Sequence, residues 1–458
     1  MPVMDLERLV AALGADEVVG AAPVEVRDLA YDARSVSAGA LFFCVPGAKA
    51  DGHDFAAEAV ASGAVALVVE RPLEVAVPQI LVPDARAAMA VAADEFYGRP
   101  TETLEVAGVT GTSGKTTTAF LLYAILAAAG RRPGLLGTVE ARVGGERRGV
   151  QRTTPEAIDL QRTFREMLDA GDRSCAMEAS SHASELHRLD RVRFAVLVFT
   201  NLSHDHLDFH GDMESYFQAK RRLFTGPAVI NVGDEYGKRL ASELPDAVTF
   251  SIDDAEALAG IDLKLRGRFN VENALGAMFA ARVLGIDDGA IARGLESMRG
   301  VPGRFETVDE GQPFEVIVDY AHKPGALENV LRAARDLTRG RVIVVVGAAG
   351  DRDRGKRPLM GRIASELADV AIVTSDNPRS EDPQGIIDEV IVGATSDVDV
   401  EPDRTAAIRR AVELAGEGDV VLIAGKGAEQ GQEFADRTIP FDDREAARDA
   451  LRALGART

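Results

Sequence analysis

The glycine-rich segment "GVTGTSGKTTT", residues 108–118, restricts the possible folds of this chain more than any other part of its sequence. It follows the apolar run "LEVA", and apolar residues then recur at helical spacing as far as Gly130. Backbone N–H groups can surround phosphate oxygens where small residues let the chain turn tightly before a helix. The segment therefore predicts a strand, a glycine turn and a helix that hold a nucleotide triphosphate.

The side chains of this segment suit that role. Gly111 and Gly114 permit the turn, and Lys115 stands at the predicted start of the helix, where its ammonium would reach the outer phosphates. A hydroxyl from Thr116 or Thr117 would then bind Mg²⁺. The segment thus predicts ATP and a magnesium ion as ligands.

The spacing departs from the usual phosphate-loop pattern. That pattern has four residues between its two glycines, but five residues separate Gly108 from Gly114, and Val109 stands at the strict position. A glycine turn without a ligand is the alternative. The concentration of glycine, lysine and threonine in one turn favours the phosphate loop.

Strands and helices alternate along most of the chain, which predicts an α/β fold with parallel sheets covered by helices. Clear instances are "RVIVVVG", "KRPLMGRIASELA", "VAIVTSD" and "DVVLIAGKG". A chain of 458 residues is long enough for about three domains. Turn-forming residues at 97–105 and 298–306 place the boundaries, and we expect domains at 1–103, 104–300 and 301–458.

Composition excludes several classes of function. A formal net charge of -21 disfavours non-specific binding to nucleic acid or to acidic membranes. The two cysteines, Cys44 and Cys175, have no paired spacing and suggest neither a disulfide framework nor a zinc site. No apolar run reaches the length of a membrane span, and the amino terminus lacks the features of an export signal. We expect a cytoplasmic protein that neither inserts into membranes nor binds nucleic acid.

Two segments after the phosphate loop carry possible metal and oxyanion ligands. In "CAMEASSHASELHRLDR" an apolar run leads into Glu178, Ser180 and His182, although a capped turn with a buried histidine would look the same. In "VFTNLSHDHLDFHG" three histidines and two aspartates follow another apolar run, with His206 at their centre. This density is compatible with zinc, but no cysteine joins it, so magnesium is favoured. Lys220, further along, resembles a surface lysine when taken alone.

Other polar residues follow predicted strands or begin predicted helices. Asn270 and Asn273, in "GRFNVENALGA", either face a flat base or cap a helix. Arg352 and Arg379 follow successive strands, at the edge where open α/β sheets bind ligands, and both suit bidentate contacts with a carboxylate. The alternative for Arg379 is that it only ties its own loop to a neighbouring carboxylate.

Taken together and in this order, these motifs resemble the Mur ligases, the ATP-dependent amino-acid-adding enzymes of peptidoglycan synthesis. The family's loop reads "TGT-Asn/Ser-GKT" after a strand and a glycine, with the spacing found here. The resemblance covers nearly the whole chain, from "YDARSVSAGALFFCVPGAKADGHDF" to "GDVVLIAGKGAEQGQEF". It implies a small N-terminal domain that binds a uridine nucleotide, a central phosphate-loop domain and a Rossmann-like C-terminal domain. It also implies a small-molecule ligase, expected to be a monomer.

The resemblance assigns roles by position. It places magnesium and the catalytic chemistry on Lys115, Thr116, Glu178, His206 and Lys220, the last as a carbamate. The positions implied for ATP are Gly111, Thr112, Gly114, Lys115, Thr116, Thr117, Asn270, Asn273, Arg304, Asp319 and His322. The positions implied for the UDP-muramoyl-dipeptide acceptor are Ala33, Arg34, Thr153, Thr154, Ser180 and Arg188. The segment "DNPR" is typical of members that add meso-diaminopimelate, and the positions implied for that amino acid are Arg352, Asp376, Asn377, Arg379, Gly425 and Glu429.

The sequence departs from the family pattern at three places. Ala33 replaces a serine, Leu186 replaces a glutamine, and Ala428 replaces a histidine. A Mur-like ligase with another acceptor or amino acid, such as L-lysine or a substrate of a pseudopeptidoglycan or natural-product pathway, is therefore an alternative. A catalytically inactive nucleotide-binding protein is a further alternative, although the implied catalytic residues are all present.

Overall fold

The computed structural model of the protein describes residues 3–15, 17–20, 23–47 and 50–455. These residues form two compact units. The first comprises the chain up to Thr110, together with Ala129–Val198 and Gln218–Ala228. The second comprises Gly111–Ala128, Phe199–Phe217 and the chain from Val229 onward. The predicted boundaries near 103 and 300 stay a prediction.

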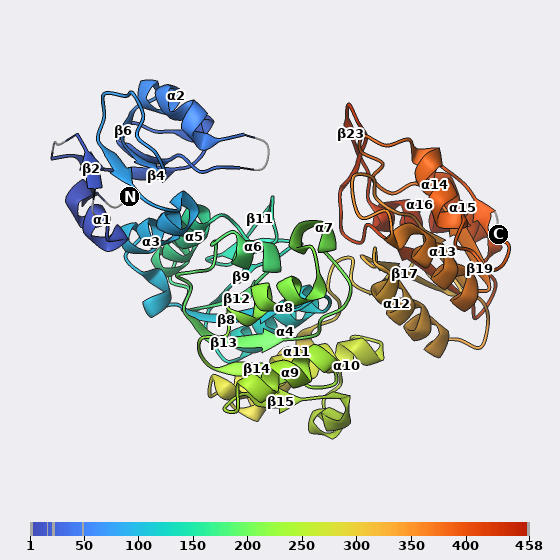
Figure 1. Cartoon of the computed structure of the whole chain (residues 1–458). Helices are drawn as coiled ribbons and strands as arrows, with labels where there is room; N and C mark the ends of the chain where they lie inside the picture. The colour runs from blue at the N-terminus through green and yellow to red at the C-terminus, as the bar shows by residue number, and fades with distance from the viewer. Residues whose placement is uncertain (1–2, 16, 21–22, 48–49, 456–458) are drawn as a thin grey trace. The chain divides into compact units, whose positions relative to one another are not determined.

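A five-stranded sheet forms the N-terminal part of the first unit (Figure 1). Its strands, in spatial order, are β2 (Glu17–Val19), β7 (Gln79–Leu81), β6 (Ala64–Val69), β5 (Ala40–Phe43) and β4 (Asp28–Ala30). Alternate residues of β5 point to opposite faces, so Leu41 and Phe43 pack in one core and Ala40 and Phe42 in another. The helices that contribute to these cores are α1 (Leu6–Leu13) and α3 (Ala85–Phe96) on one face and α2 (Ala56–Ala61) on the other. A small antiparallel pair joins β1 (Met4–Asp5) to β3 (Glu25–Val26).

A second sheet of the first unit ends where predicted ligand residues begin. The first six of its eight strands, in spatial order, are β11 (Glu146–Arg148), β10 (Ala141–Val143), β9 (Pro133–Leu136), β12 (Ser174–Glu178), β8 (Glu105–Thr110) and β13 (Phe194–Phe199). Strands β8, β9 and β12 are parallel, and nearly all of their residues are buried, as is usual for parallel strands covered on both faces. The helices of this region are α5 (Ala157–Asp169) and α6 (Ser181–Glu185). Glu178 is the last residue of β12, so it lies at the carboxyl edge of the sheet.

The helix predicted after the glycine turn is α4 (Lys115–Ala128), in the second unit. Its burial on nearly all sides explains why its sequence is apolar around most of its circumference. It packs against α10 (Arg268–Val283) and α11 (Asp288–Ser297). The chain between residues 207 and 250 forms α7 (Leu207–His210), α8 (Met213–Arg221), β14 (Ala228–Asn231), α9 (Glu235–Glu243) and β15 (Val248–Phe250).

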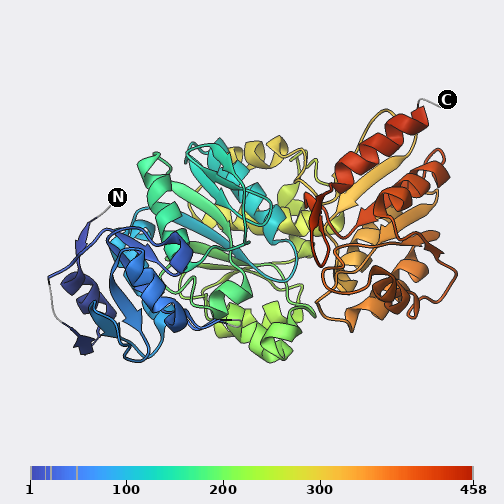
Figure 2. The same ribbon diagram turned by 90° about the horizontal axis from the view of Figure 1, so that it is seen from above.

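The C-terminal part of the second unit is a six-stranded sheet covered on both faces. Its strands, in spatial order, are β16 (Glu306–Thr307), β17 (Glu315–Asp319), β21 (Val420–Ala424), β18 (Val342–Val346), β19 (Val370–Val373) and β20 (Asp399–Val400). Val344 and Leu422 pack in the core formed with α12 (Pro324–Asp336), α13 (Lys356–Leu367) and α14 (Pro383–Ile391). Val345 and Ile423 pack in the opposite core, with α15 (Arg404–Leu414) and α16 (Asp443–Gly455), and Figure 2 shows these two red helices side by side. The predicted α/β class with parallel sheets is confirmed.

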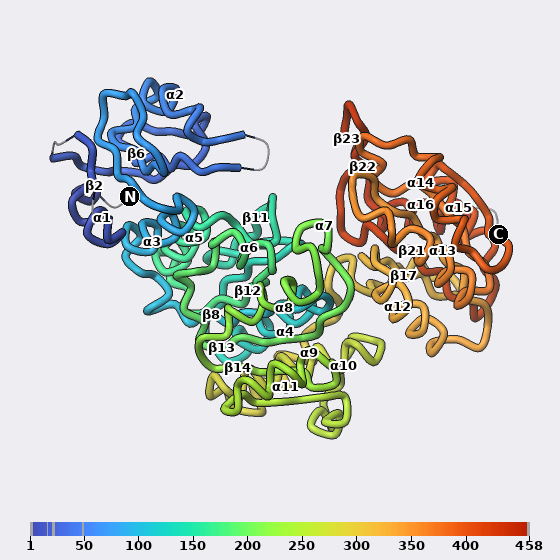
Figure 3. Tube along the Cα trace, in the orientation of Figure 1, coloured from blue at the N-terminus to red at the C-terminus, as the bar shows by residue number. Residues whose placement is uncertain are grey.

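The remaining elements are short. The hairpin of β22 (Gly431–Glu433) and β23 (Thr438–Pro440) can be followed in Figure 3. Four 3₁₀ turns occupy Ala33–Ser35, Gly52–Phe55, Pro100–Glu102 and Ile252–Leu258 among the described residues. None of the helices in the described ranges has the length and hydropathy that a membrane span requires.

Candidate functional site

The glycine turn has a backbone that only glycine adopts without strain. Gly111 and Gly114 have φ angles of +145° and +87°. A Cβ atom on Gly111 would lie 1.9 Å from Thr200 Oγ1, and one on Gly114 would lie 2.3 Å from Asn273 Oδ1. Lys115 begins α4, as the spacing predicts. Glycine at these two positions therefore lets the turn pack closely against Thr200 and Asn273, and the turn leads directly into the N-terminus of α4, which can bind an anion.

Hydrogen bonds fix the shape of this loop. Ser113 N donates to Asn201 Oδ1 at 2.9 Å, and Thr200 Oγ1 donates to Ser113 O at 2.7 Å. Lys115 Nζ donates to the carbonyl oxygens of Gly111 and Thr112, at 2.8 and 2.9 Å. The ammonium is thus held over the loop whose N–H groups would receive phosphate oxygens.

Asn270 and Asn273 do not cap their helix. Gly267 is the N-cap of α10, and the structure shows no side-chain cap there. The Asn273 amide donates to Asn270 Oδ1 at 3.1 Å, and Asn270 Nδ2 donates to Arg266 O at 2.8 Å. Thr118 Oγ1 of α4 donates to Asn273 Oδ1 at 3.4 Å. The capping alternative is therefore wrong, and this pair of amides lies against the helix of the phosphate loop.

Arg304 joins the same region. Its Nη2 donates to Thr116 Oγ1 at 3.1 Å, and its guanidinium lies 4.2 Å from the centre of the Tyr320 ring. Asp319 accepts hydrogen bonds from the N–H groups of Phe305 and Ala321, both at 2.7 Å. Burial raises the pKa of Asp319 to about 6, although Arg304 opposes this shift. The predicted residues Thr116, Arg304 and Asp319 therefore form one connected group.

His322 is partly buried beside this group. Its Nδ1 lies 2.8 Å from Tyr320 O, and Lys356 Nζ donates to the carbonyl of His322 at 2.9 Å. Burial lowers the pKa of His322 well below its usual value, and the charges of Lys323 and Lys356 add to this effect. His322 is therefore neutral at physiological pH.

His206, a predicted metal ligand, lies after β13 and immediately before α7. It has a left-handed backbone, with φ +54°, and its Nε2 lies 2.8 Å from Asp205 Oδ2. Desolvation lowers the pKa of His206, although Asp205 opposes the shift. A neutral imidazole can bind a metal ion. Asp205 also accepts a hydrogen bond from Lys323 Nζ, and His206 and Lys323 hold the pKa of its carboxyl far below the usual range despite burial.

Glu178 offers a buried carboxylate at the end of β12. Its Oε1 accepts from Thr138 N at 2.7 Å, and its Oε2 accepts from Thr138 Oγ1 at 3.1 Å. Each oxygen retains a lone pair for a further ligand. Within the described ranges, no three histidine, cysteine or acidic side chains are grouped so that they could hold a metal ion. A zinc site would need such a group of ligands. Mg²⁺ requires only one or two protein ligands besides phosphate and water.

Four of the residues predicted to hold the acceptor, Thr153, Thr154, Ser180 and Arg188, lie together in the first unit. Thr154 Oγ1 donates to Glu178 O at 2.8 Å and accepts from Ser180 N at 3.2 Å. Arg188 Nη1 donates to Thr154 O at 3.2 Å, and Thr153 Oγ1 lies 3.0 Å from Thr138 Oγ1.

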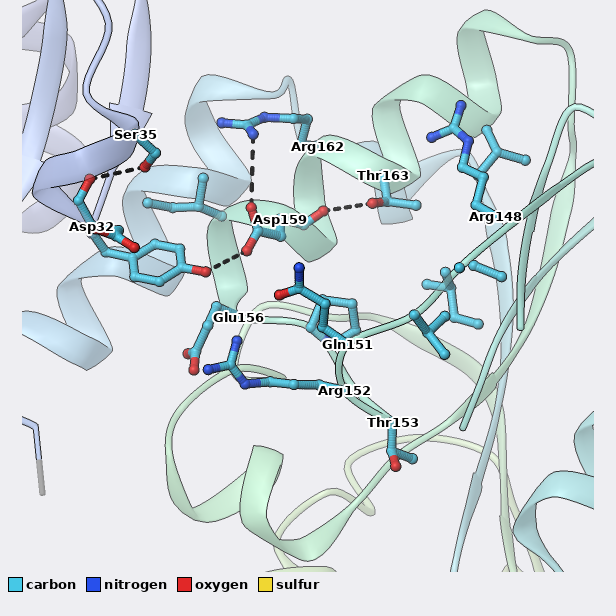
Figure 4. Close-up of a pocket in the computed structure, with 18 of the residues that line it drawn as sticks. Asp32, Ser35, Arg148, Gln151, Arg152, Thr153, Glu156, Asp159, Arg162 and Thr163 are labelled. Carbon is cyan, nitrogen blue, oxygen red and sulfur yellow. Dashed lines mark hydrogen bonds and ion pairs between the residues drawn. The ribbon is translucent and has the colours of Figure 1, made fainter. Parts of the chain in front are cut away.

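A cavity of about 510 Å³ lies next to these residues, lined by the segment from Asp28 to Ser35 and by the segment from Arg148 to Thr163 (Figure 4). Thr153 lines it, but Ala33 and Arg34 do not. Arg34 is exposed and pairs with Asp32 at 2.6 Å. The structure therefore places only Asp32 and Ser35 of this 3₁₀ turn at the cavity.

Lys220 is buried, with an exposed fraction of 1%. The interpretation of Lys220 as a surface lysine is therefore wrong. The sequence around it, "SYFQAKRRLF", contains as many polar as apolar residues, so its helix does not reveal which face is covered.

The amino-acid positions of the C-terminal part also lie close together. Asn377 Nδ2 donates to Glu429 Oε2 at 2.9 Å. Gly425 has φ +127°, and a Cβ there would lie 2.8 Å from Asp376 Oδ2. The fully buried Lys426 donates to Asn377 Oδ1 at 2.7 Å and to Glu429 Oε2 at 3.2 Å.

Arg379 and Arg352 differ in their surroundings. Arg379 Nε donates to Glu433 Oε2 at 2.8 Å, and its Nη1 donates to Gly350 O at 2.9 Å. Arg352 is exposed. Arg379 therefore ties its loop to the carboxylate of Glu433, as expected if its role is to hold that loop in place.

Sequence reasoning did not single out several residues of these sites. Lys426 and Lys323 lie within the segments "GKGAE" and "DYAHKP", and Arg152 and Glu156 lie within "QRTTPEA". A lysine between two glycines was the available signal for Lys426. Nothing in the local pattern reveals that Tyr31 OH donates to Asp159 at 2.7 Å, because 128 positions separate these residues.

Three family descriptions match successive parts of the chain. Residues 25–97 match the Mur ligase family catalytic domain, residues 109–260 the Mur ligase middle domain, and residues 303–427 the Mur ligase glutamate ligase domain.

Curated proteins and solved structures extend this similarity. A UDP-N-acetylmuramoyl-L-alanyl-D-glutamate--2,6-diaminopimelate ligase from Solibacter usitatus is 47% identical, over 95% of each chain. The protein of the same name from Streptomyces coelicolor is 44% identical, over 96% of this chain and 95% of its own. A solved structure of a ligase of that name has a TM-score of 0.67 and 31% identity, and covers 99% of this chain and all of its own. MurF ligase from Thermotoga maritima in complex with ADP shares the fold, with a TM-score of 0.62 and 21% identity, over 94% of this chain and 99% of its own.

Proposed function

The chain belongs to the Mur ligase family and is an ATP-dependent ligase, and we propose that it adds meso-diaminopimelate to UDP-N-acetylmuramoyl-L-alanyl-D-glutamate in peptidoglycan synthesis. The observation that carries the proposal is the identity of 47%, along 95% of the chain, to a ligase of that name. The phosphate loop at Lys115 supports the ATP-dependent part. We also propose that the protein acts in the cytoplasm as a monomer.

The reaction needs activation because a carboxylate is a poor acylating agent. ATP transfers its γ-phosphoryl group to the acceptor carboxylate, which gives an acyl phosphate and ADP. The amine of the incoming amino acid attacks this acyl phosphate through a tetrahedral intermediate, which releases phosphate and leaves an amide. Lys115 would offset charge on the transferred phosphoryl oxygens, since its ammonium is already held over the loop.

The nucleotide would also contact residues outside the loop. Arg304 bonds to Thr116 next to the loop lysine, and the amides of Asn270 and Asn273 face α4. We propose that these side chains and Asp319 bind the ATP. Thr112, Thr117 and His322 would complete the nucleotide site.

Magnesium fits the donor set of this chain. Thr116, Glu178 and His206 would hold it, since a hydroxyl, a carboxylate with spare lone pairs and a neutral imidazole all bind such ions. When bound, Mg²⁺ neutralises phosphate charge during transfer. Lys220, as a carbamate, would add carboxylate oxygens on the acceptor side.

The amino acid would bind in the C-terminal part of the second unit. Glu429 and Asn377 would accept the distal ammonium of diaminopimelate, beside Asp376 and Gly425. Arg352 and Arg379 would bind the distal carboxylate, which lysine lacks.

One observation favours a second candidate, a Mur-like ligase that adds L-lysine. Arg379 already bonds to Glu433, so this arginine is partly neutralised before any amino acid arrives. An amino-acid panel with UDP-N-acetylmuramoyl-L-alanyl-D-glutamate, followed by ADP release and product mass, tests both candidates. Efficient use of diaminopimelate alone supports the proposal. Preferential use of lysine supports the second candidate, and no ADP release with any amino acid would reject both.

A further inference from the structure

A fully buried ion pair lies in the C-terminal part of the second unit, among residues to which the proposed function gives no role. Arg404 is the first residue of α15 and Asp443 is the first residue of α16, and neither side chain has any exposed surface. Arg404 Nε and Nη2 donate to the two carboxylate oxygens of Asp443, both at 2.7 Å. The pair thus joins the beginnings of the two helices that lie side by side in Figure 2.

The same guanidinium also holds two loops at the carboxyl edge of the sheet. Its Nη2 donates to Ala424 O at 3.1 Å, and its Nη1 donates to Ser375 O at 3.4 Å. Ala424 is the last residue of β21, and Ser375 lies two positions after the end of β19. The residue that follows each of these carbonyls, Gly425 or Asp376, is proposed to bind the amino acid. Arg404 thereby ties both loops of the amino-acid site to one buried group.

The region around Arg404 is closely packed and strongly charged. A Cβ atom on Gly425 would lie 2.8 Å from Asp376 Oδ2 and 3.6 Å from Arg404 Nη2. Burial acts to lower the pKa of this guanidinium, but the carboxylates of Asp443, Asp376 and Glu429 raise its pKa above the usual value. The guanidinium therefore stays charged, and its charge acts on two of the residues proposed to bind the amino acid.

Stability alone does not account for this ion pair. The desolvation of two buried charges opposes folding about as strongly as their attraction favours it, so apolar residues of similar volume are often equally stable. The helix dipole also disfavours a cation at the first residue of a helix. The N-terminus of α15 is already capped by Asp403, which accepts a hydrogen bond from Ala406 N at 2.9 Å. What Arg404 adds, and an apolar residue could not, is its hydrogen bonds to the two loop carbonyls.

We infer that Arg404, held in place by Asp443, is a positioning residue for the incoming amino acid. It fixes the distance between the loops that follow β19 and β21 and does not itself touch the substrate. The inference rests on the proposed function, which assigns the amino acid to these loops. Asn377 and Glu429 lie on the two loops and bond to each other at 2.9 Å, so a shift of either loop changes the arrangement of both side chains. A displacement of about 1 Å in binding groups is enough to slow a reaction strongly.

Steady-state kinetics of a paired variant test this inference. Arg404→Met/Asp443→Val removes both charges together and keeps a similar volume, so no unpaired charge is left buried. With the amino acid that wild-type protein ligates, we expect kcat/KM to fall about tenfold to a hundredfold. The KM values for ATP and for the acceptor should change by less than about threefold, because other residues bind these substrates. Arg404→Lys keeps the charge and can still donate to Asp443, so its loss should be smaller and equally confined to the amino acid.

Ile408→Ala is the matched control. Ile408 lies on α15 one turn beyond Arg404 and packs in the core, but its side chain cannot hydrogen-bond to either loop. Its truncation lowers the melting temperature through lost packing and should leave kcat/KM for the amino acid within about threefold of wild type. Circular dichroism and thermal melting identify a temperature at which all the variants are folded, and the kinetics are measured there.

The outcomes separate the inference from the proposed function. If wild-type protein ligates an amino acid and the folded paired variant keeps its kcat/KM, the positioning role of Arg404 is overturned and the function stands. Equal losses for all three substrates also overturn it, because they indicate a general structural role. A loss of the same size in Ile408→Ala overturns it for the same reason. If the paired variant does not fold, Arg404→Lys decides: a loss confined to the amino acid supports the inference, and unchanged kinetics overturn it. Wild-type protein that ligates no amino acid overturns both proposals.

Discussion

Arg379 Nε donates a hydrogen bond of 2.8 Å to Glu433 Oε2, across 54 positions of sequence. Arg379 has a left-handed backbone with φ +53°, and its own N–H donates to Glu433 O at 3.0 Å. The loop after β19 is therefore pinned to β22 by both backbone and side chain. A guanidinium has five N–H donors, and Glu433 and Gly350 occupy two of them. The other donors remain for the carboxylate of an amino acid.

Lys115→Ala is expected to abolish ligation and to leave the fold intact. The lysine stands at the first turn of α4, where its ammonium donates to the carbonyl oxygens of Gly111 and Thr112. Loss of the cation leaves developing phosphoryl charge uncompensated, which costs about 3 kcal/mol or more of transition-state stabilisation. ADP release with acceptor and amino acid measures the rate. The exposed Lys238, changed to Ala, is the control, and wild-type turnover in a folded Lys115→Ala protein would contradict the phosphate-loop assignment.

Lys220→Ala is expected to lose most activity and to regain part of it when a short carboxylate is added. A carbamate supplies two oxygens, and a small carboxylic acid can place similar oxygens in the space that the truncated side chain leaves. The buried position of Lys220 provides such a space. Activity is measured with increasing acetate or formate, and Lys115→Ala serves as a control that carboxylates should not rescue. An unchanged rate in Lys220→Ala would remove the carbamate from the mechanism.

Asp319 is expected to make the stability of the protein fall as pH rises. Its pKa is raised from 3.8 to about 6 by burial, so the folded state binds a proton more tightly than the unfolded state. The stabilisation that comes from protonated Asp319 is complete below its pKa in the unfolded state, and it is lost as pH rises through its pKa in the folded state. Its size is about 3 kcal/mol, from about two pKa units. Urea unfolding at pH 4 and pH 7 compares wild type with Asp319→Asn, which lacks this titration; identical pH dependence in the two proteins would contradict the assignment.

Much of the fold could be predicted because local pattern and tertiary structure agree. The helix expected after the glycine turn is α4, and Pro324 begins α12, where the fixed φ of proline suits the first helical turn. Parallel strands such as β18 are buried on both faces, so their unbroken runs of valine are unambiguous. In these segments the local sequence pattern alone indicates the secondary structure and which residues are buried.

The candidate sites could be predicted only in part, because their chemistry depends on distant partners. The burial of Lys220 could not be predicted, because polar and apolar residues are equally frequent in the sequence around it and do not indicate which face is covered. The pairing of Arg379 with Glu433 joins two segments that are far apart in sequence. A motif identifies the residue types that a reaction needs. Which of their charges are already paired can be seen only in the folded structure.

The last prediction is that wild-type protein uses meso-diaminopimelate in strong preference to lysine, and that Arg379→Ala loses this preference. The distal end of diaminopimelate carries an ammonium and a carboxylate, whereas lysine offers only the ammonium, which Arg352 and Arg379 would repel. If lysine bound, a desolvated guanidinium would be left without a carboxylate partner. We therefore expect kcat/KM for diaminopimelate to exceed that for lysine about a thousandfold.

The pairing of Arg379 with Glu433 makes a second variant informative. Glu433→Gln keeps the size of the partner but removes its charge, so it should strengthen the attraction for the distal carboxylate and preserve the preference. Values of kcat/KM for both amino acids are measured in wild type, Arg379→Ala and Glu433→Gln. If Arg379→Ala keeps the preference of wild type, Arg379 only ties its loop to β22, and the carboxylate must be bound by Arg352. If wild type uses lysine as well as diaminopimelate, the amino-acid assignment is wrong even though the ligase assignment survives.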